Sequence, residues 1–248
     1  MTLWRHKGDS GPGHKTAGEL GHSQFGTPLK EILHAEPIPD PAKWIMVPVH
    51  WGGFSSGPDD WSAEMGQSRW EVWLELNPGS EDLGPEAHAR TAAELKRYAE
   101  RYGGPRPQDP YEIVTYVYLP DPHKSAILLH VCVDDRPGLT VEQATADSDA
   151  IQTPIADEFN TEALGTGRKV TYHGALDPQP GDLPGTRQMW VSVYYAFAIP
   201  DRQAVVTVRA TGTDLGGMSA AADDLDTFVR TITLDFADGT PFTVGSGS

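Results

Sequence analysis

The sequence is poor in cysteine, in basic side chains and in long apolar runs. The single cysteine, Cys132, excludes an intrachain disulfide, and its place inside the apolar run 127–133 predicts a buried, inert thiol. Lysine and arginine total 19 against 35 aspartates and glutamates, giving a formal net charge of -16 at pH 7. This imbalance disfavours binding to nucleic-acid phosphates or anionic membranes and instead favours solubility, cations or a basic protein partner.

No apolar stretch approaches the roughly 18 residues that a membrane span needs. The first ten residues are followed by Gly11-Pro12-Gly13 and not by the apolar core of a secretory signal. We therefore expect a cytoplasmic protein that does not insert into a membrane.

Motifs of the common enzyme and cofactor classes are also missing. The sequence has no HExxH, GxSxG, paired CxxC or Walker pattern. A metal-binding N-terminal tail is conceivable on four histidines, but their spacings of eight and twelve do not place them on one helix face. The alternative is a solvated arm. These histidines are His6, His14, His22 and His34. We favour a non-enzymatic protein without cofactor or bound metal, which binds another protein; self-association stays open.

The chain divides into three parts by composition. Residues 1–35 are polar and glycine-rich, which predicts a flexible N-terminal arm that orders only against a partner. Residues 36–236 carry the periodic apolar signals and are expected to form a single domain. Residues 237–248 are again rich in glycine and small polar residues, which predicts a disordered tail.

Within the domain, strand and helix signals follow one another. Pro85 and the glycines after Tyr102 bound a predicted helix. A weak helix is expected at 141–151, the segment 157–163 is ambiguous, and an amphipathic helix is predicted from 218 to 232, with its aspartates largely on the polar face. Strands are predicted at 44–49 (an edge strand because of Pro48), 68–76, 111–119, 125–133, 165–173, 188–199 and 204–209. The prediction is an α+β fold with one mainly antiparallel sheet of about six strands covered by helices.

The last third of the chain combines an apolar strand ending at Ile199, the turn 200–203, a following strand and a helix up to Ile232. In these features it resembles the PsbP-like family, which includes LpqN-type proteins. The approach to Trp44 through Ile38-Pro39 is similar to the start of such domains. The resemblance spans residues 36 to 236 and implies an α/β/α sandwich used for binding or assembly, with no catalytic motif to carry over.

The stretch from His50 to Trp61 is predicted to be a long loop with embedded aromatics, and it is the preferred partner-binding site. Its aromatic residues form either a small satellite core under the loop or an exposed anchor for a partner. Two adjacent aspartates of the loop could meet a basic partner. The predicted partner-binding residues are Trp51, Phe54, Asp59, Asp60 and Trp61.

Two other functions compete with an assembly or adaptor role. An immunity protein could neutralise a basic toxin through the negative surface. A metal-dependent hydrolase could be centred on His50, Asp59 and Asp60, with His130 or His173 arriving from a strand.

Overall fold

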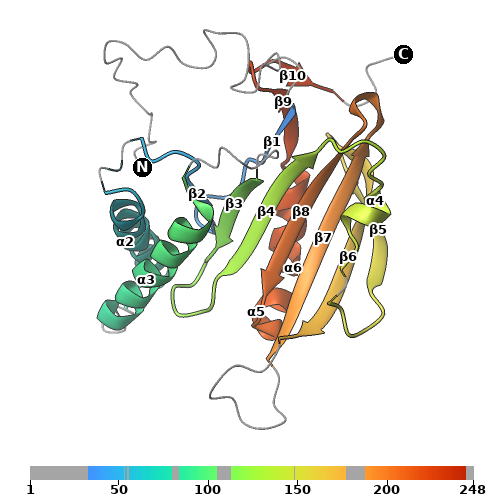
Figure 1. Cartoon of the computed structure of the whole chain (residues 1–248). Coiled ribbons are helices and arrows are strands. Elements are labelled where there is room, and N and C mark those ends of the chain that lie inside the picture. Colours follow the sequence, from blue (N-terminus) through green and yellow to red (C-terminus); the bar gives the residue numbers. More distant parts are fainter. Residues whose placement is uncertain are drawn as a thin grey trace.

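The computed structural model describes residues 33–52, 54, 56–79, 84–104, 113–147, 149–176 and 188–243 (Figure 1). Almost all of the predicted N-terminal arm lies outside the described residues, and so do the last five residues of the predicted tail.

The fold is α+β, as predicted, and its largest unit is an antiparallel sheet of seven strands instead of about six. The strand order is β2-β3-β4-β8-β7-β6-β5, and each neighbouring pair is antiparallel. The strands β2 and β5 therefore form the two edges. The bounds are β2 Trp44–Val47, β3 Ile113–Tyr118, β4 Ile127–Asp134, β5 Ile155–Thr161, β6 Gly165–Ala175, β7 Met189–Ile199 and β8 Ala204–Gly212.

A smaller sheet joins the two ends of the described chain. Its order is β1 (Leu33–Glu36), β9 (Thr233–Phe236) and β10 (Pro241–Phe242), with antiparallel pairing. The strand β1 lies at the end of the range assigned to the arm, and β10 lies in the range assigned to the tail. Both terminal ranges thus contribute a strand.

One face of the large sheet is covered by helices α5 (Leu215–Ala220) and α6 (Ala222–Arg230), which lie behind β8 and β7 in Figure 1. Leu225, Phe228 and Val229 of α6 pack into the main apolar core against inward side chains of β3, β4, β7 and β8. The apolar periodicity predicted one helix over 218–232. Two helices form because the backbone leaves the regular helical angles at Ala221, where ψ is -4°.

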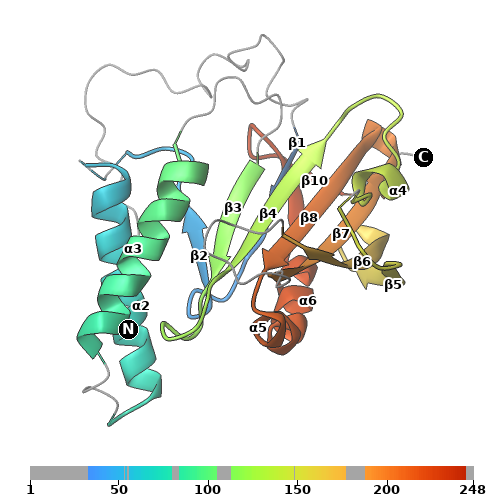
Figure 2. The ribbon, with the colours of Figure 1, turned by 60° about the horizontal axis from the view of Figure 1, so that its bottom comes forward.

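The opposite face of the sheet is covered at its β2 end by helices α2 (Pro58–Leu76) and α3 (Gly84–Tyr102) (Figure 2). Alternate residues of β2 and β3 point to this side, where they meet Leu95, Tyr98 and Ala99 of α3. The helix predicted from Pro85 is confirmed.

The strand predicted at 68–76 is wrong, because this stretch is the second half of α2. Gly66, Arg69, Trp70 and Trp73 are buried at helical spacing, whereas Leu76 is 67% exposed. Trp70 and Trp73 therefore do not point to opposite faces; their rings stack with centroids 5.1 Å apart. The helix signal lay upstream, where Pro58 occupies the first turn ahead of two aspartates.

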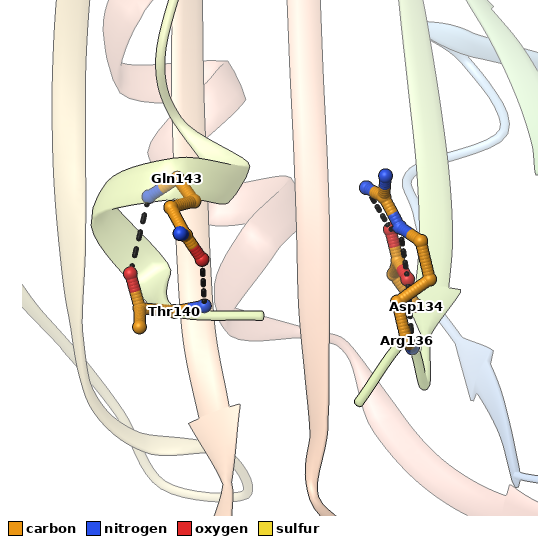
Figure 3. A network of polar contacts seen from close by, with 4 residues as sticks. All are labelled: Asp134, Arg136, Thr140 and Gln143. Carbon is orange, nitrogen blue, oxygen red and sulfur yellow. Dashed lines mark hydrogen bonds and ion pairs between the residues drawn. The ribbon is translucent and has the colours of Figure 1, made fainter. Parts of the chain in front are cut away.

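The connection from β4 to the β5 edge is fixed by two local polar contacts (Figure 3). At the end of β4, the guanidinium of Arg136 donates to both carboxylate oxygens of Asp134, at 2.7 to 3.0 Å. Thr140 and Gln143 form a capping box that opens α4 (Val141–Ala144). The weak helix predicted for 141–151 is thus a single turn, which lies in front of the sheet in Figure 1.

Candidate partner-binding site

The aromatic side chains of the segment 50–61 form a satellite core. Helix α2 begins inside the segment at Pro58, so the loop is shorter than predicted. Trp61 is only 2% exposed and lies in the cluster beneath α3. Trp51 and Phe54 are half-buried against the same cluster, and the Trp51 and Trp61 rings meet edge to face at 6.5 Å. Trp61 thus has almost no surface to offer a partner.

Two glycines at the end of α3 make room for Trp51. A Cβ atom on Gly103 would lie 2.6 Å from the Trp51 ring, and one on Gly104 would lie 2.8 Å from its Nε1. Gly104 also has a φ of +78°, which favours glycine, and its N–H donates to the Pro48 carbonyl at 2.9 Å. The loop is therefore locked onto the helix end.

The two aspartates that were predicted in the loop lie in the first turn of α2. Asp59 forms an ion pair with Lys96 of α3 at 2.5 Å, although both side chains are well exposed. The hydrogen bond and the charge of Asp59 raise the pKa of Lys96. Asp60 accepts a hydrogen bond from the Ser56 N–H at 2.7 Å. Both carboxylates lie where the helix dipole favours negative charge, so local structure accounts for them.

The structure spreads the proposed hydrolase residues over distant elements. His50 is exposed at the start of the loop. His130 lies in β4, where its Nδ1 is 3.0 Å from Thr115 Oγ1 and its ring packs on Tyr102. His173 lies in β6, and strands β8 and β7 separate it from β4. Over the described residues, no group of three or more His, Cys, Asp or Glu side chains is placed to hold a metal ion.

Cys132 is half-buried, not fully buried as predicted. It lies on β4 with the parity of His130, on the face opposite the main core, whereas Leu129 and Val131 point into that core. The apolar run predicted burial on both faces, but only one face of this strand is fully covered.

The acidic helix α6 turns two of its aspartates toward the sheet. Asp224 accepts hydrogen bonds from Lys43 and from the Tyr118 hydroxyl, each at 2.6 Å. Asp226 accepts from Lys169 and the Tyr195 hydroxyl, also at 2.6 Å. The expected polar outer face is therefore partly an inner one, and these aspartates attach the helix to both halves of the sheet.

Burial and these contacts shift the pKa values of the groups involved. Burial would raise the pKa of Asp224, but the hydrogen bonds from Lys43 and Tyr118 and the Lys43 charge outweigh it and lower that pKa. Burial and the bond to Asp224 raise the pKa of Tyr118, and burial and the bond to Asp226 raise that of Tyr195. Both phenols therefore stay protonated and act as donors.

The feature that remains open is the edge strand β5, the last strand of the large sheet in Figure 1. Its seven residues pair with β6 over the full register from Ile155–Thr171 to Thr161–Gly165. Within the described part of the chain, β6 alone hydrogen-bonds to the β5 backbone. Every second residue of β5 thus directs its N–H and C=O groups outward.

Two buried side chains hold β5 in place. Phe159 is 5% exposed and lies edge-on against Tyr195 and Phe197, at 5.0 and 6.3 Å. The Arg230 guanidinium lies 4.7 Å from the centre of the same ring. Leu164, just beyond the strand, is 1% exposed, and its N–H donates to Thr161 Oγ1. The edge is therefore fixed on the sheet, and no described strand pairs with its outer side.

The rest of β5 faces solvent. Every residue from Ile151 to Glu158 is exposed, and the two isoleucines Ile151 and Ile155 are 54% and 60% exposed. The strand also carries the acidic residues Asp157 and Glu158. An exposed edge with apolar and acidic side chains is a surface suited to another chain.

This edge was not predicted, because 157–163 gave no clear signal. Along Ile155 to Thr161 only Phe159 is buried, so apolar and polar residues do not alternate. The signal that could have revealed β5 was Gly165 at the start of the neighbouring strand. Its φ is +74°, and a glycine at this place indicates a turn from a preceding strand.

Comparisons with protein-family models, with curated proteins and with solved structures gave no match. The resemblance to PsbP-like proteins therefore stays a prediction from the sequence. Of the helices that the structure describes, none combines the length and the apolar character needed to cross a bilayer.

Proposed function

We propose that the protein is a protein-binding module that takes up an extended segment of a partner as an additional strand beside β5. The observation that carries the proposal is the open edge itself, seven residues long and hydrogen-bonded on one side only among the described residues. Strand addition to an exposed sheet edge is a common mode of peptide recognition, in which main-chain hydrogen bonds supply affinity and side chains supply specificity.

The rigidity of the edge supports this function. Phe159 and Leu164 fix β5 before a partner arrives, so association does not have to order the receiving strand. Seven residues span roughly 23 Å at the usual rise of about 3.3 Å per residue, which is enough for a short peptide segment. The His50 to Trp61 segment offers less, since its aromatics are committed to packing.

The test is a titration followed by amide NMR. The probes are three blocked seven-residue peptides of valine and threonine, with two adjacent central residues that are lysine, glutamine or glutamate. Strand addition predicts shifts confined to β5 and β6 and slower hydrogen exchange of every second β5 amide, with β2 unchanged. If none of the three peptides protects β5 amides, or if the shifts map to other surfaces, the proposed function is wrong.

A further inference from the structure

Resting on the proposed function, we infer that the segment received by β5 is basic, with lysine or arginine facing Asp157 and Glu158 on both sides of the added strand. The parity of β5 places Asp157 on the side of Phe159 and α6, and Glu158 on the opposite side. A matching segment therefore carries two neighbouring basic residues, because successive side chains of a strand point to opposite faces.

The first argument is that the natural counter-ions of these carboxylates are engaged elsewhere. The register sets Asp157 beside Lys169 and Glu158 beside Arg168 on β6. Lys169 instead forms its ion pair with Asp226 at 2.6 Å, and Arg168 lies 3.7 Å from Glu142 of α4.

As a result, the two β5 carboxylates have no counter-ion in the described part of the chain. Among the described residues, neither Asp157 nor Glu158 has a cation within ion-pair distance; Glu158 accepts one hydrogen bond, from Asn160 at 3.1 Å. A basic side chain on an added strand would lie directly opposite them, where opposite charges attract.

The second argument concerns a second copy of this chain, the other natural occupant of an open edge. Glu158 is the central residue of Ile155–Thr161. Symmetric antiparallel pairing of two β5 strands would place Glu158 opposite its own copy and two chains of net charge -16 against each other. Like charges directly opposite destabilise a strand pair. The edge therefore disfavours pairing with β5 of a second copy and favours a basic segment.

The apolar side chains of the edge complete the description of the partner. Ile155 shares the parity of Asp157 and is 60% exposed. An apolar residue of the partner two positions from the basic one would cover it. Pro154 immediately before the strand has no N–H to donate, so the added strand ends there.

The experiment compares the three peptides on the full chain and on two variants. Asp157→Asn/Glu158→Gln neutralises the edge, and Glu64→Gln/Glu75→Gln removes two exposed carboxylates of α2 as a control of equal charge. We expect the lysine peptide to bind about tenfold more tightly than the glutamine peptide, or about threefold per carboxylate, and the glutamate peptide to bind least. The edge variant should lose this preference and the control should keep it.

The outcomes separate the inference from the proposed function. Equal protection of β5 by the glutamine and lysine peptides would keep strand addition and overturn the basic partner. A lysine preference that survives in the edge variant would also overturn it, since net charge alone would then explain the binding. Sedimentation of the chain alone checks self-pairing: a dimer that dissociates with Glu158→Lys would favour β5 against β5 and contradict the inference.

Discussion

The two edges of the large sheet are built in opposite ways. The strand β2 has four residues, three of them buried. Non-strand groups engage its first residue and both flanks: Arg69 donates to the carbonyls of Ala42 and Trp44, and the Gly104 N–H donates to that of Pro48. The strand β5 has seven residues, six of them not buried, and pairs only with β6 among the described residues.

The difference shows what an edge needs in order to be closed. At β2, the buried Arg69 guanidinium of α2 and the end of α3 hydrogen-bond to carbonyls that a further strand would otherwise use. Burial lowers the pKa of Arg69 to about 10, which outweighs the opposing effect of the Asp40 charge. At β5, side chains anchor the strand from beneath and nothing described covers its rim. A closed edge ends a sheet, whereas an open edge that is fixed in place can extend it.

The largest effect is expected from the anchor of the open edge. Phe159→Ala should lower the free energy of unfolding by about 3–5 kcal/mol, because it removes a buried ring from contact with Tyr195 and Phe197. Chemical denaturation measures the loss, and amide exchange should speed up in β5 and β6 while β2 stays protected. Ile155→Ala is the control and should change stability by less than about 0.5 kcal/mol. Equal exchange at both edges would break the comparison.

A smaller loss is expected from the glycine opposite that anchor. Gly167 is the register partner of Phe159, and a Cβ there would lie 2.3 Å from the Phe197 ring and 2.5 Å from the Ala196 carbonyl. Gly167→Ala should therefore cost about 1–3 kcal/mol through overpacking, measured by thermal or chemical unfolding. Gly52→Ala, where an added Cβ meets nothing within 4 Å, is the matched control. Tolerance of Gly167→Ala would show that β6 packs against β7 more loosely than the structure indicates.

The third effect concerns the attachment of α6 near the closed edge. Asp224→Asn removes a charged acceptor from Lys43 and Tyr118 and should cost about 1–2 kcal/mol at pH 7. The folded pKa of Asp224 lies below its ordinary 3.8, so the unfolded chain binds more protons in acid. Its stabilisation is complete above about pH 4 and is lost as the pH falls through the folded pKa.

Denaturation curves between pH 7 and pH 2 measure this dependence. The Asp224→Asn variant should lose less stability in acid than the parent chain does. Asp223→Asn, which changes an exposed neighbour, should leave the profile as it is. Identical slopes for all three proteins would mean that Asp224 does not attach the helix.

The smallest effect is expected at the two acidic residues of β5, Asp157 and Glu158. Asp157→Asn/Glu158→Gln should change the stability of the isolated protein by no more than about 0.5 kcal/mol, since neither carboxylate has a cationic partner among the described residues. Unfolding in urea measures it. A loss above about 1 kcal/mol would show that these two carboxylates stabilise the fold and would remove the reason to expect a partner there.

Much of the fold could be predicted because buried elements carry strong patterns. The strand β7, which ends at Ile199, and the helix α3, which begins at Gly84, are each buried along at least one face, and their periodicities follow from that burial. In α2 the prediction failed, because Trp70, Val72 and Leu74 alternate by chance while burial follows Gly66, Trp70 and Trp73. Helical and strand periods overlap over such short windows.

The candidate site could not be predicted for the opposite reason. An exposed edge strand buries few side chains, and β5 buries only one of its seven. Its sequence therefore shows no alternation of apolar and polar residues from which a strand could be predicted. The aromatic loop attracted attention because tryptophans are visible in a sequence, yet their burial beneath α3 depends on contacts with residues more than about 30 positions away.

The order in which the chain connects the strands of the two sheets has a consequence for how it folds. The central pair joins β4, which ends at Asp134, to β8, which starts at Ala204, and the small sheet pairs Leu33 with Phe236. The first pair cannot form before β8 has been synthesised, and the second cannot form before β9. Contacts so distant in sequence slow folding, so the β5–β6 hairpin, whose residues are neighbours, is available before the strands that will support it.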